Sequence, residues 1–199
     1  PYDPWDQRLC LVPDSDFFEA VKTGKASIVT GQIETFEKDG VRLQSGDRVP
    51  ADIVITATGL RLSLGGKIAV SLDGRPAEWT GHWFYRGCMF SNVPNLAIVF
   101  GYLNASWTLR ADNTSDYVCR VLNRMRDKRA DVVVPYLPDD HALEVVEPFP
   151  FSSGYLQRAR HLIPRSAATL PWRLNQHYLE DCRDCRRRPV DDGVLRFEN

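Results

Sequence analysis

Two places in the sequence combine an apolar run with small residues and glycine, a pattern that allows a ligand to approach the backbone closely. The first is Thr-Ala-Thr-Gly at residues 56–59, which follows the apolar residues 53–55. Small side chains and glycine let a second backbone or a planar cofactor come within van der Waals distance of the chain. A tight exit from a strand has the same composition, so Thr58 and Gly59 are candidates for either role.

The second place is residues 100–107, where a glycine loop connects an apolar run to a long helical pattern. Tyr102, Asn104, Ala105 and Ser106 lie in this loop. The first turn of a helix offers unpaired N–H groups and a partial positive charge, which suit an anionic or electron-rich ligand edge. Asn104 could equally serve as the N-cap of the helix. The loop is therefore either a ligand site or a helix cap.

The elements before the first place are short. Asp14 and Ser15 predict the cap of a helix from Phe17 to Lys22, and Gly24 is expected to end it. Alternating or apolar runs predict strands at residues 26–30, 32–37 and 41–43. Turn sequences at residues 38–40 and 45–47 flank the last of them. The continuous apolar run within residues 52–58 predicts a strand that is buried on both faces and ends at Gly59.

The elements around the second place are longer. Residues 96–100 predict another buried strand, and residues 105–126 predict a helix. Spacings of three, four and seven residues place its apolar positions on one face. These positions are Trp107, Ala111, Val118, Leu122 and Met125. A strand is expected at residues 132–134, and short helices are expected at residues 154–162 and 174–187.

Composition limits the classes of partner. The 199 residues carry a formal net charge of -1, so bulk electrostatics does not point to nucleic acid. No apolar run approaches the roughly 20 residues that span a bilayer, and no signal peptide is recognised. Five cysteines without a framework spacing fit a reducing compartment, so a cytoplasmic location is expected. Cys182 and Cys185 form a C-x-x-C without a second pair, so no metal site is expected.

Five segments together resemble the C-terminal half of class B flavoprotein monooxygenases. This class includes the Baeyer–Villiger and flavin-containing monooxygenases, and the nearest branch is the ethionamide-activating enzymes. The segments are residues 2–13, 51–59, 101–109, 171–174 and 191–193. The resemblance covers nearly the whole chain. It implies an α/β fold, a partial two-dinucleotide-binding Rossmann-like fold. Residues 1–57 would complete an NADPH-binding domain, residues 58–130 would return to an FAD-binding domain, and residues 131–199 would form a helical or irregular extension.

The resemblance also assigns roles to the candidate residues. Thr58 and Gly59 would belong to the linker that returns the chain to the FAD domain. Asn104 to Trp107 would sit at the start of the helix that is aimed at the pyrimidine edge of the flavin, and Tyr102, Asn104, Ala105 and Ser106 would bind the cofactor. Arg8 would be the catalytic arginine that contacts both the flavin peroxide and the nicotinamide, although an ion pair with Asp3 or Asp6 is the alternative. Gln7 stands where relatives often carry lysine, at a position that would contact the cofactor.

The reaction implied by the resemblance uses NADPH to reduce FAD, which then captures O2 as a flavin C4a-peroxide. The substrates would be small molecules such as ketones, sulfides or thioamides. No G-x-G-x-x-G is present in the 199 residues, so the glycine-rich units that hold the two pyrophosphates are absent from this sequence. The isolated chain is therefore expected to bind no FAD and to self-associate through its uncovered apolar strands.

Two other classes of protein share part of the pattern. A relative of the pyridine-nucleotide disulfide reductases would have a similar domain plan, but it needs a redox cysteine pair beside the flavin. Cys182 and Cys185 lie in the wrong part of the chain for that role. A binding module without catalysis is the other alternative. A flavin spectrum of the full-length protein would separate these classes.

Overall fold

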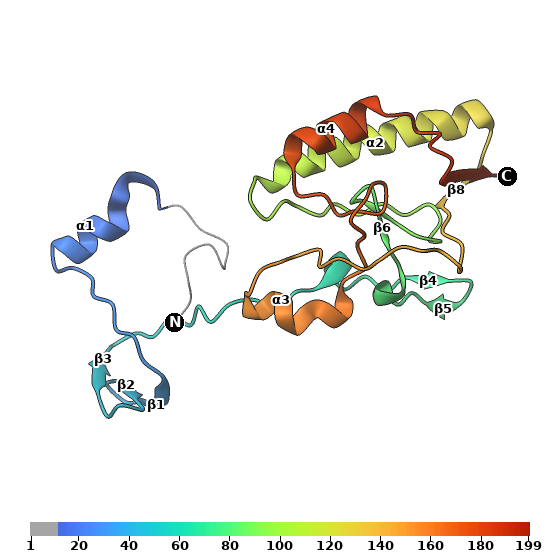
Figure 1. Ribbon diagram of the computed structural model, residues 1–199. Coiled ribbons are helices and arrows are strands. Elements are labelled where there is room, and N and C mark those ends of the chain that lie inside the picture. The colour runs from blue at the N-terminus through green and yellow to red at the C-terminus, as the bar shows by residue number, and fades with distance from the viewer. Residues whose placement is uncertain (1–11) are drawn as a thin grey trace. The chain divides into compact units, whose positions relative to one another are not determined.

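The structure is a computed structural model that describes residues 12–199. The described residues divide into a smaller compact unit, which ends at Leu60, and a larger unit, Arg61–Asn199 (Figure 1). Each unit is described separately below. Both mix helices and strands, which agrees at that coarse level with the expected α/β class. Within residues 12–199, no helix is both long enough and apolar enough to cross a bilayer.

The smaller unit consists of a short helix and a three-stranded antiparallel sheet. Its elements are η1 (Pro13–Ser15), α1 (Asp16–Lys22), β1 (Ile33–Glu37), β2 (Gly40–Leu43) and β3 (Arg48–Pro50). The strands pair in the order β1-β2-β3, and the turns that connect them lie where the glycine-containing turn sequences predict. Gly24 follows α1 with φ +73°, which confirms the predicted end of that helix.

Several predictions for this unit are wrong. Ser15 stands at the N-cap of α1 but makes no side-chain capping bond, and residues 26–30 form no strand. The expected buried strand at residues 52–58 is absent, and Ile53 and Ile55 are 81% and 86% exposed. The apolar run still carries the pattern of a strand covered on both faces. A strand forms only where a neighbour accepts its hydrogen bonds, and the described residues supply none for this run.

The larger unit contains three helices, three short 3-10 turns and three two-stranded antiparallel sheets, within the part of the chain described here. In order, they are η2 (Leu64–Lys67), β4 (Ser71–Leu72), β5 (Arg75–Pro76), η3 (Trp79–Gly81), β6 (Phe84–Tyr85), β7 (Met89–Phe90), α2 (Trp107–Lys128), β8 (Val132–Pro135), α3 (Gly154–Ala159), η4 (Arg160–Leu162), α4 (Tyr178–Arg187) and β9 (Leu195–Glu198). The sheets pair β4 with β5, β6 with β7, and β8 with β9.

The long helix, α2, confirms the prediction of a helix but not of its buried face. The positions expected to be buried include Trp107 and Leu122, which are 53% and 57% exposed. The buried positions are instead Arg110, Asn113, Thr114, Tyr117 and Val121. Four of these five side chains carry a polar group, so a pattern based on apolar residues assigns the wrong face. The helix α4 lies against α2 (Figure 1).

The other predictions for the larger unit have mixed outcomes. The strand at residues 132–134 is confirmed as β8, and α3 together with η4 occupies residues 154–162 as expected. The helix predicted at residues 174–187 begins later, as α4 at Tyr178. The expected strand at residues 96–100 is wrong: the Ile98 N–H donates to the Cys88 carbonyl at 2.7 Å, but the segment forms no strand. Its alternate residues Leu96, Ile98 and Phe100 pack on the core, whereas the residues between them are exposed.

The core of the larger unit is organised around β6. Successive strand residues point to opposite faces, so Tyr85 and Phe84 enter two different apolar clusters. Tyr85 packs with Trp172, whose ring centroid lies 5.6 Å away, and with side chains of α2, β8 and β9. Phe84 packs with Phe90 and Phe100 in the second cluster. Both side chains are fully buried.

Candidate functional site

The loop of residues 101–106 leads directly into α2. Gly101 and Tyr102 are buried, Ala105 is half-buried, and Asn104 and Ser106 are exposed. Ser106 occupies the N-cap position, so the alternative that Asn104 caps the helix is wrong. The Ser106 hydroxyl makes no capping bond, and its oxygen lies 2.7 Å from the hydroxyl oxygen of Thr108. The N-cap side chain therefore satisfies none of the N–H groups of the first turn of α2, which are the groups that bind anions at helix starts.

Tyr102 anchors this loop in the protein interior. Its hydroxyl donates to Oδ2 of Asp181 at 2.6 Å, and Nη2 of Arg110 lies 3.1 Å from the same oxygen. The guanidinium carbon of Arg110 stands 4.1 Å from the centroid of the Tyr102 ring. The amide of Asn113 donates to the Tyr102 hydroxyl at 3.4 Å. We name Tyr102, Arg110 and Asp181 the buried triad, because all three are at most 4% exposed.

The charges of the buried triad compensate one another. Burial raises the pKa of the Asp181 carboxyl, although Arg110 and the Tyr102 hydroxyl oppose that change. Burial also raises the pKa of Tyr102 above its ordinary value, and the bond to Asp181 adds to the effect. The phenol therefore stays protonated and acts as a donor, and the Arg110 guanidinium supplies the positive charge.

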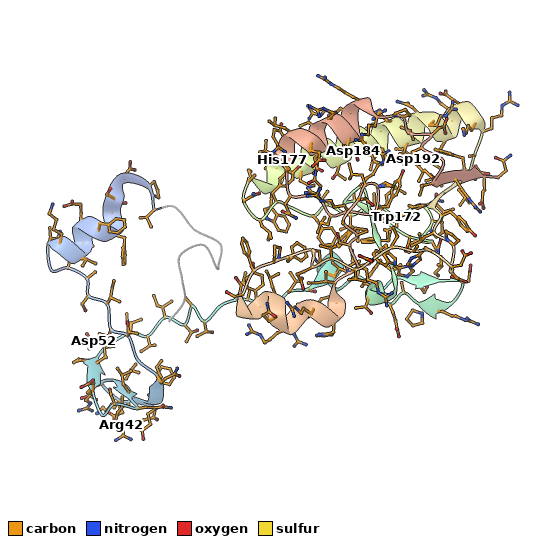
Figure 2. All side chains as sticks on the ribbon, viewed as in Figure 1. Arg42, Asp52, Trp172, His177, Asp184 and Asp192 are labelled. Atoms are coloured by element: carbon orange, nitrogen blue, oxygen red, sulfur yellow. The ribbon has the colours of Figure 1, made fainter. Side chains whose placement is uncertain are left out.

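A second buried cluster joins α4 to β6. Arg86 lies 2.7 Å from Asp184 and 3.0 Å from Asp192, and Tyr85 donates to Asp192 at 2.7 Å. Figure 2 labels Asp184 on α4 and Asp192 in the segment that follows it. Burial opposes ionisation of Asp192, but hydrogen bonds led by that from Tyr85 outweigh it and hold its pKa below the usual range. Burial raises the pKa of Asp184, and Arg86 opposes this.

The sequence reading missed the partners of both clusters. Asp181 and Asp184 are three residues apart on α4, so they project from the same face toward Arg110 and Arg86. One signal was available, because Arg86 stands inside the otherwise apolar stretch 83–90. A cation placed in such a stretch requires a buried carboxylate elsewhere in the chain. The sequence does not show which carboxylate fills that role.

Gly101 is the one glycine of the loop, and it lies directly beneath an aromatic ring. A Cβ atom built there would come within 2.0 to 2.3 Å of three atoms of the Trp107 indole. Only glycine therefore allows the ring to rest on the backbone at this point. The indole is still 53% exposed. The loop and Trp107, the first residue of α2, thus pack closely at Gly101, while part of the indole faces solvent. We call this contact between Gly101 and Trp107 the packed corner.

The other sequence-predicted site residues lie elsewhere. Thr58 and Gly59 belong to the smaller unit, where both are exposed. Gly59 has φ +98°, a backbone conformation that favours glycine. Their proximity to the loop of residues 101–106 stays a prediction. Arg8 and Gln7 lie outside the described residues, so their roles also stay predictions.

The C-x-x-C of α4 has the environment of structural cysteines. Burial raises the pKa of Cys185 to about 12, which keeps this thiol protonated and weakly nucleophilic. Cys182 donates to Oδ1 of Asn113 at 3.4 Å. Neither forms a disulfide. Over residues 12–199, no group of three or more metal-ligating side chains is assembled.

Two adjoining cavities of the larger unit measure about 440 and 400 Å³. They share Arg61, Leu62 and Leu162 and lie between the segment that follows the smaller unit and α3 with η4. Neither is lined by the loop of residues 101–106. The candidate site at the start of α2 is therefore distinct from these two cavities.

Comparison with known proteins shows what the chain is similar to. The chain is 49% identical over 197 residues to the FAD-containing monooxygenase EthA of Mycobacterium tuberculosis. It is 42% identical to the probable FAD-binding monooxygenase AlmA of Acinetobacter baylyi and to the putative FAD-containing monooxygenase MymA of M. tuberculosis. These matches cover 98 to 99% of the chain but only about 40% of each relative. No family model matches, and neither does a solved structure.

Over its own length, the chain is a homologue of FAD-containing monooxygenases. This finding confirms the resemblance to flavoprotein monooxygenases that the sequence motifs indicated. Because the chain spans about 40% of the length of these relatives, the activity of the whole protein is treated below as a proposal.

Proposed function

We propose that this chain is part of an FAD- and NADPH-dependent monooxygenase that uses O2 to oxygenate a small molecule. The substrate would be a ketone, into which oxygen is inserted, or a sulfur or nitrogen centre such as that of a sulfide or thioamide. The observation that carries the proposal is the match of nearly the entire chain to three FAD monooxygenases at 42 to 49% identity. We further propose the Rossmann-like fold and the domain boundaries at residues 57/58 and 130/131 for the whole protein.

The start of α2 fits the electron-rich edge of a flavin. The helix is 22 residues long, and its N-cap side chain makes no bond to the backbone N–H groups of the first turn. Asn104 and Ser106 are exposed beside it, so a ring edge would meet backbone N–H groups and small polar side chains. The helix dipole would favour negative charge on that edge. Bound FAD would supply electron transfer from NADPH and the activation of O2.

The chain's own residues would orient the flavin and stabilise negative charge that develops beside it. The loop of residues 101–106 would position the flavin edge, and Thr58 with Gly59 would allow close backbone approach where the chain returns to the FAD domain. Arg8 would place a positive charge beside the reacting centre, where preorganised cations stabilise developing negative charge. Gln7 would contact the cofactor beside it. The pyrophosphates of both nucleotides need glycine-rich loops that residues 1–199 do not contain.

The disulfide-reductase alternative loses support from the geometry. Such an enzyme needs an accessible thiol of low pKa next to the flavin. Cys185 has the opposite character, because burial raises its pKa to about 12. The binding-module alternative predicts no flavin in the whole protein.

The test uses the whole protein and two aspartate substitutions on α2. Ser106→Asp places a negative charge at the proposed flavin edge, whereas Asn123→Asp adds the same charge at an exposed position far along the helix. Aspartate is a good N-cap residue, so Ser106→Asp should keep or raise Tm. Its Kd for FAD should nevertheless rise about two- to fivefold, since the charge competes for the helix dipole. Asn123→Asp should leave the Kd unchanged.

The parent protein provides the decisive control. Purified with FAD and desalted, it should show flavin absorbance and consume NADPH and O2 faster when a ketone or sulfide is added. A parent protein without flavin absorbance would refute the proposal as a whole. Equal Kd values for the two aspartate variants would refute only the assignment of the flavin edge to the start of α2.

A further inference from the structure

We propose that Asp181 of α4 is a positioning residue for the loop of residues 101–106. It acts through Tyr102 and Arg110, the other members of the buried triad. The proposal rests on the proposed function in one respect, namely that this loop faces FAD. It assigns to α4, which contributes no residue of the loop itself, the task of holding the flavin edge in place.

The geometry converges on one carboxylate oxygen. Oδ2 of Asp181 accepts from the Tyr102 hydroxyl at 2.6 Å and lies 3.1 Å from Nη2 of Arg110. The guanidinium also covers the Tyr102 ring at 4.1 Å, so the phenol is held both at its hydroxyl and across its face. A side chain held at two points has little freedom to change rotamer, and its backbone is fixed with it.

A second tether fixes the next residue of the loop. The Leu103 N–H donates to Oε1 of Gln176 at 2.9 Å. Arg110 also donates through Nη2 to the carbonyl of Asn175. Residues 175–181, which enter and begin α4, therefore hold two successive residues of the loop and the second turn of α2. The tethers run from the loop to a single segment about 75 residues further along the chain.

The loop is tethered on one side only. Tyr102 is fully buried, whereas Asn104, Ser106 and Trp107 are exposed. Among the loop residues expected at the cofactor, Asn104 and Ser106 are thus exposed, whereas Tyr102 is held in the interior. Their placement depends on the anchored residues that precede them. This division between a fixed inner side and an open outer side is the arrangement expected of a site held by supporting residues.

Stability alone is a weak reason for an ion pair in this position. A buried ion pair loses much of its attraction to the cost of removing both charges from water, and apolar residues of similar volume often stabilise a fold as well. The hydrogen bond between the Tyr102 hydroxyl and Oδ2 of Asp181 does favour one geometry of the loop, because a shift of Tyr102 would leave both buried oxygen atoms without this partner. The effect expected of the triad is therefore a defined loop position.

The test compares two buried tyrosines in the whole protein. Tyr102→Phe removes only the hydroxyl that bonds to Asp181. Tyr85→Phe is the matched control, since Tyr85 is equally buried and its hydroxyl donates to Asp192 at 2.7 Å, outside the loop of residues 101–106. Hydrogen exchange of the segment 101–109 is measured by mass spectrometry together with Tm. We expect exchange in this segment to accelerate about tenfold in Tyr102→Phe and to stay at the parental rate in Tyr85→Phe.

FAD binding is the second readout. Titration of the apoprotein should give a Kd about tenfold weaker for Tyr102→Phe and unchanged for Tyr85→Phe. Asp181→Asn should show the same pattern as Tyr102→Phe in both measurements. Parental exchange rates in Tyr102→Phe, or equal acceleration in the two tyrosine variants, would overturn the proposal whether or not FAD binds. If exchange accelerates in Tyr102→Phe but the parent protein binds no FAD, the proposed function is refuted and the anchoring of the loop by Asp181 stands.

Discussion

Gly101→Ala is the most direct test of the packed corner at the start of α2. The new Cβ atom would meet three atoms of the Trp107 indole at 2.0, 2.2 and 2.3 Å. Carbon atoms pack best at about 3.5–4.0 Å, so the ring or the backbone must move by more than 1 Å. One of the three atoms is Cγ, which is fixed to the helix through Cβ, so a small rotation of the ring does not relieve the contact.

The loss of stability expected for Gly101→Ala follows from this steric overlap. Overpacking of this size typically destabilises a protein by about 1–3 kcal/mol. Trp107 is 53% exposed, so the ring can swing toward solvent, and we expect a value near the lower end of that range. The free energy of unfolding is measured by urea denaturation of the whole protein. Near-ultraviolet circular dichroism should also change, because the indole loses its fixed surroundings.

A double-mutant cycle isolates the contact. Trp107→Ala removes the ring, so Gly101→Ala should cost at least about 1 kcal/mol less in that background than in the parent. Thr108→Ala in place of Trp107→Ala is the matched control, and it should leave the cost unchanged. If Gly101→Ala costs the same with and without the indole, the ring does not rest on Gly101 and the described corner is incorrect.

Three further predictions concern charge, catalysis and the isolated chain. The folded-state pKa of Asp192 is depressed, so its contribution to stability is present above the unfolded pKa of about 4 and is lost as pH falls through the folded value. Asp192→Asn should therefore reduce the loss of unfolding free energy between about pH 5 and pH 2, and an identical pH profile would contradict this assignment. Arg8→Ala in the whole protein should retain NADPH-driven flavin reduction but lose oxygen transfer, at a cost of about 2–4 kcal/mol, as followed by stopped-flow absorbance. Oxygenation at the parental rate would show that Arg8 lies at the surface. The isolated 199-residue chain should be colourless after incubation with FAD and desalting, and it should self-associate in light scattering through apolar segments such as residues 53–55. A stoichiometric flavin band would show that the cofactor site is misplaced.

The sequence predicts elements well where the signal is local. The hairpin of β1 and β2 follows from its turn residues, and α3 with η4 follows from proline and glycine boundaries. The length of α2 follows from a long helical pattern. These elements are set by interactions between residues close in sequence, which a single sequence displays directly.

The sequence fails where the outcome depends on distant partners. Residues 52–58 and 96–100 have the composition of buried strands, but a strand forms only where a neighbour accepts its hydrogen bonds. The buried face of α2 was assigned to apolar positions such as Leu122. In the structure, that face is built around Arg110, which α4 neutralises through Asp181. Burial of a charged residue can be predicted only when its ion-pair partner is known. The partner of Arg110 is Asp181, which lies 71 residues away along the chain.

For the candidate site, the motifs alone proposed the loop of residues 101–106, predicted the helix that follows it and indicated the resemblance to flavin monooxygenases. They did not show that Tyr102 faces inward while Asn104 and Ser106 face outward. That division was decided by the tertiary structure, because α4 brings Asp181 to within 2.6 Å of the Tyr102 hydroxyl. Burial in a medium of low polarity makes an unpaired hydroxyl or carboxylate costly, and so selects the one arrangement in which both are bonded.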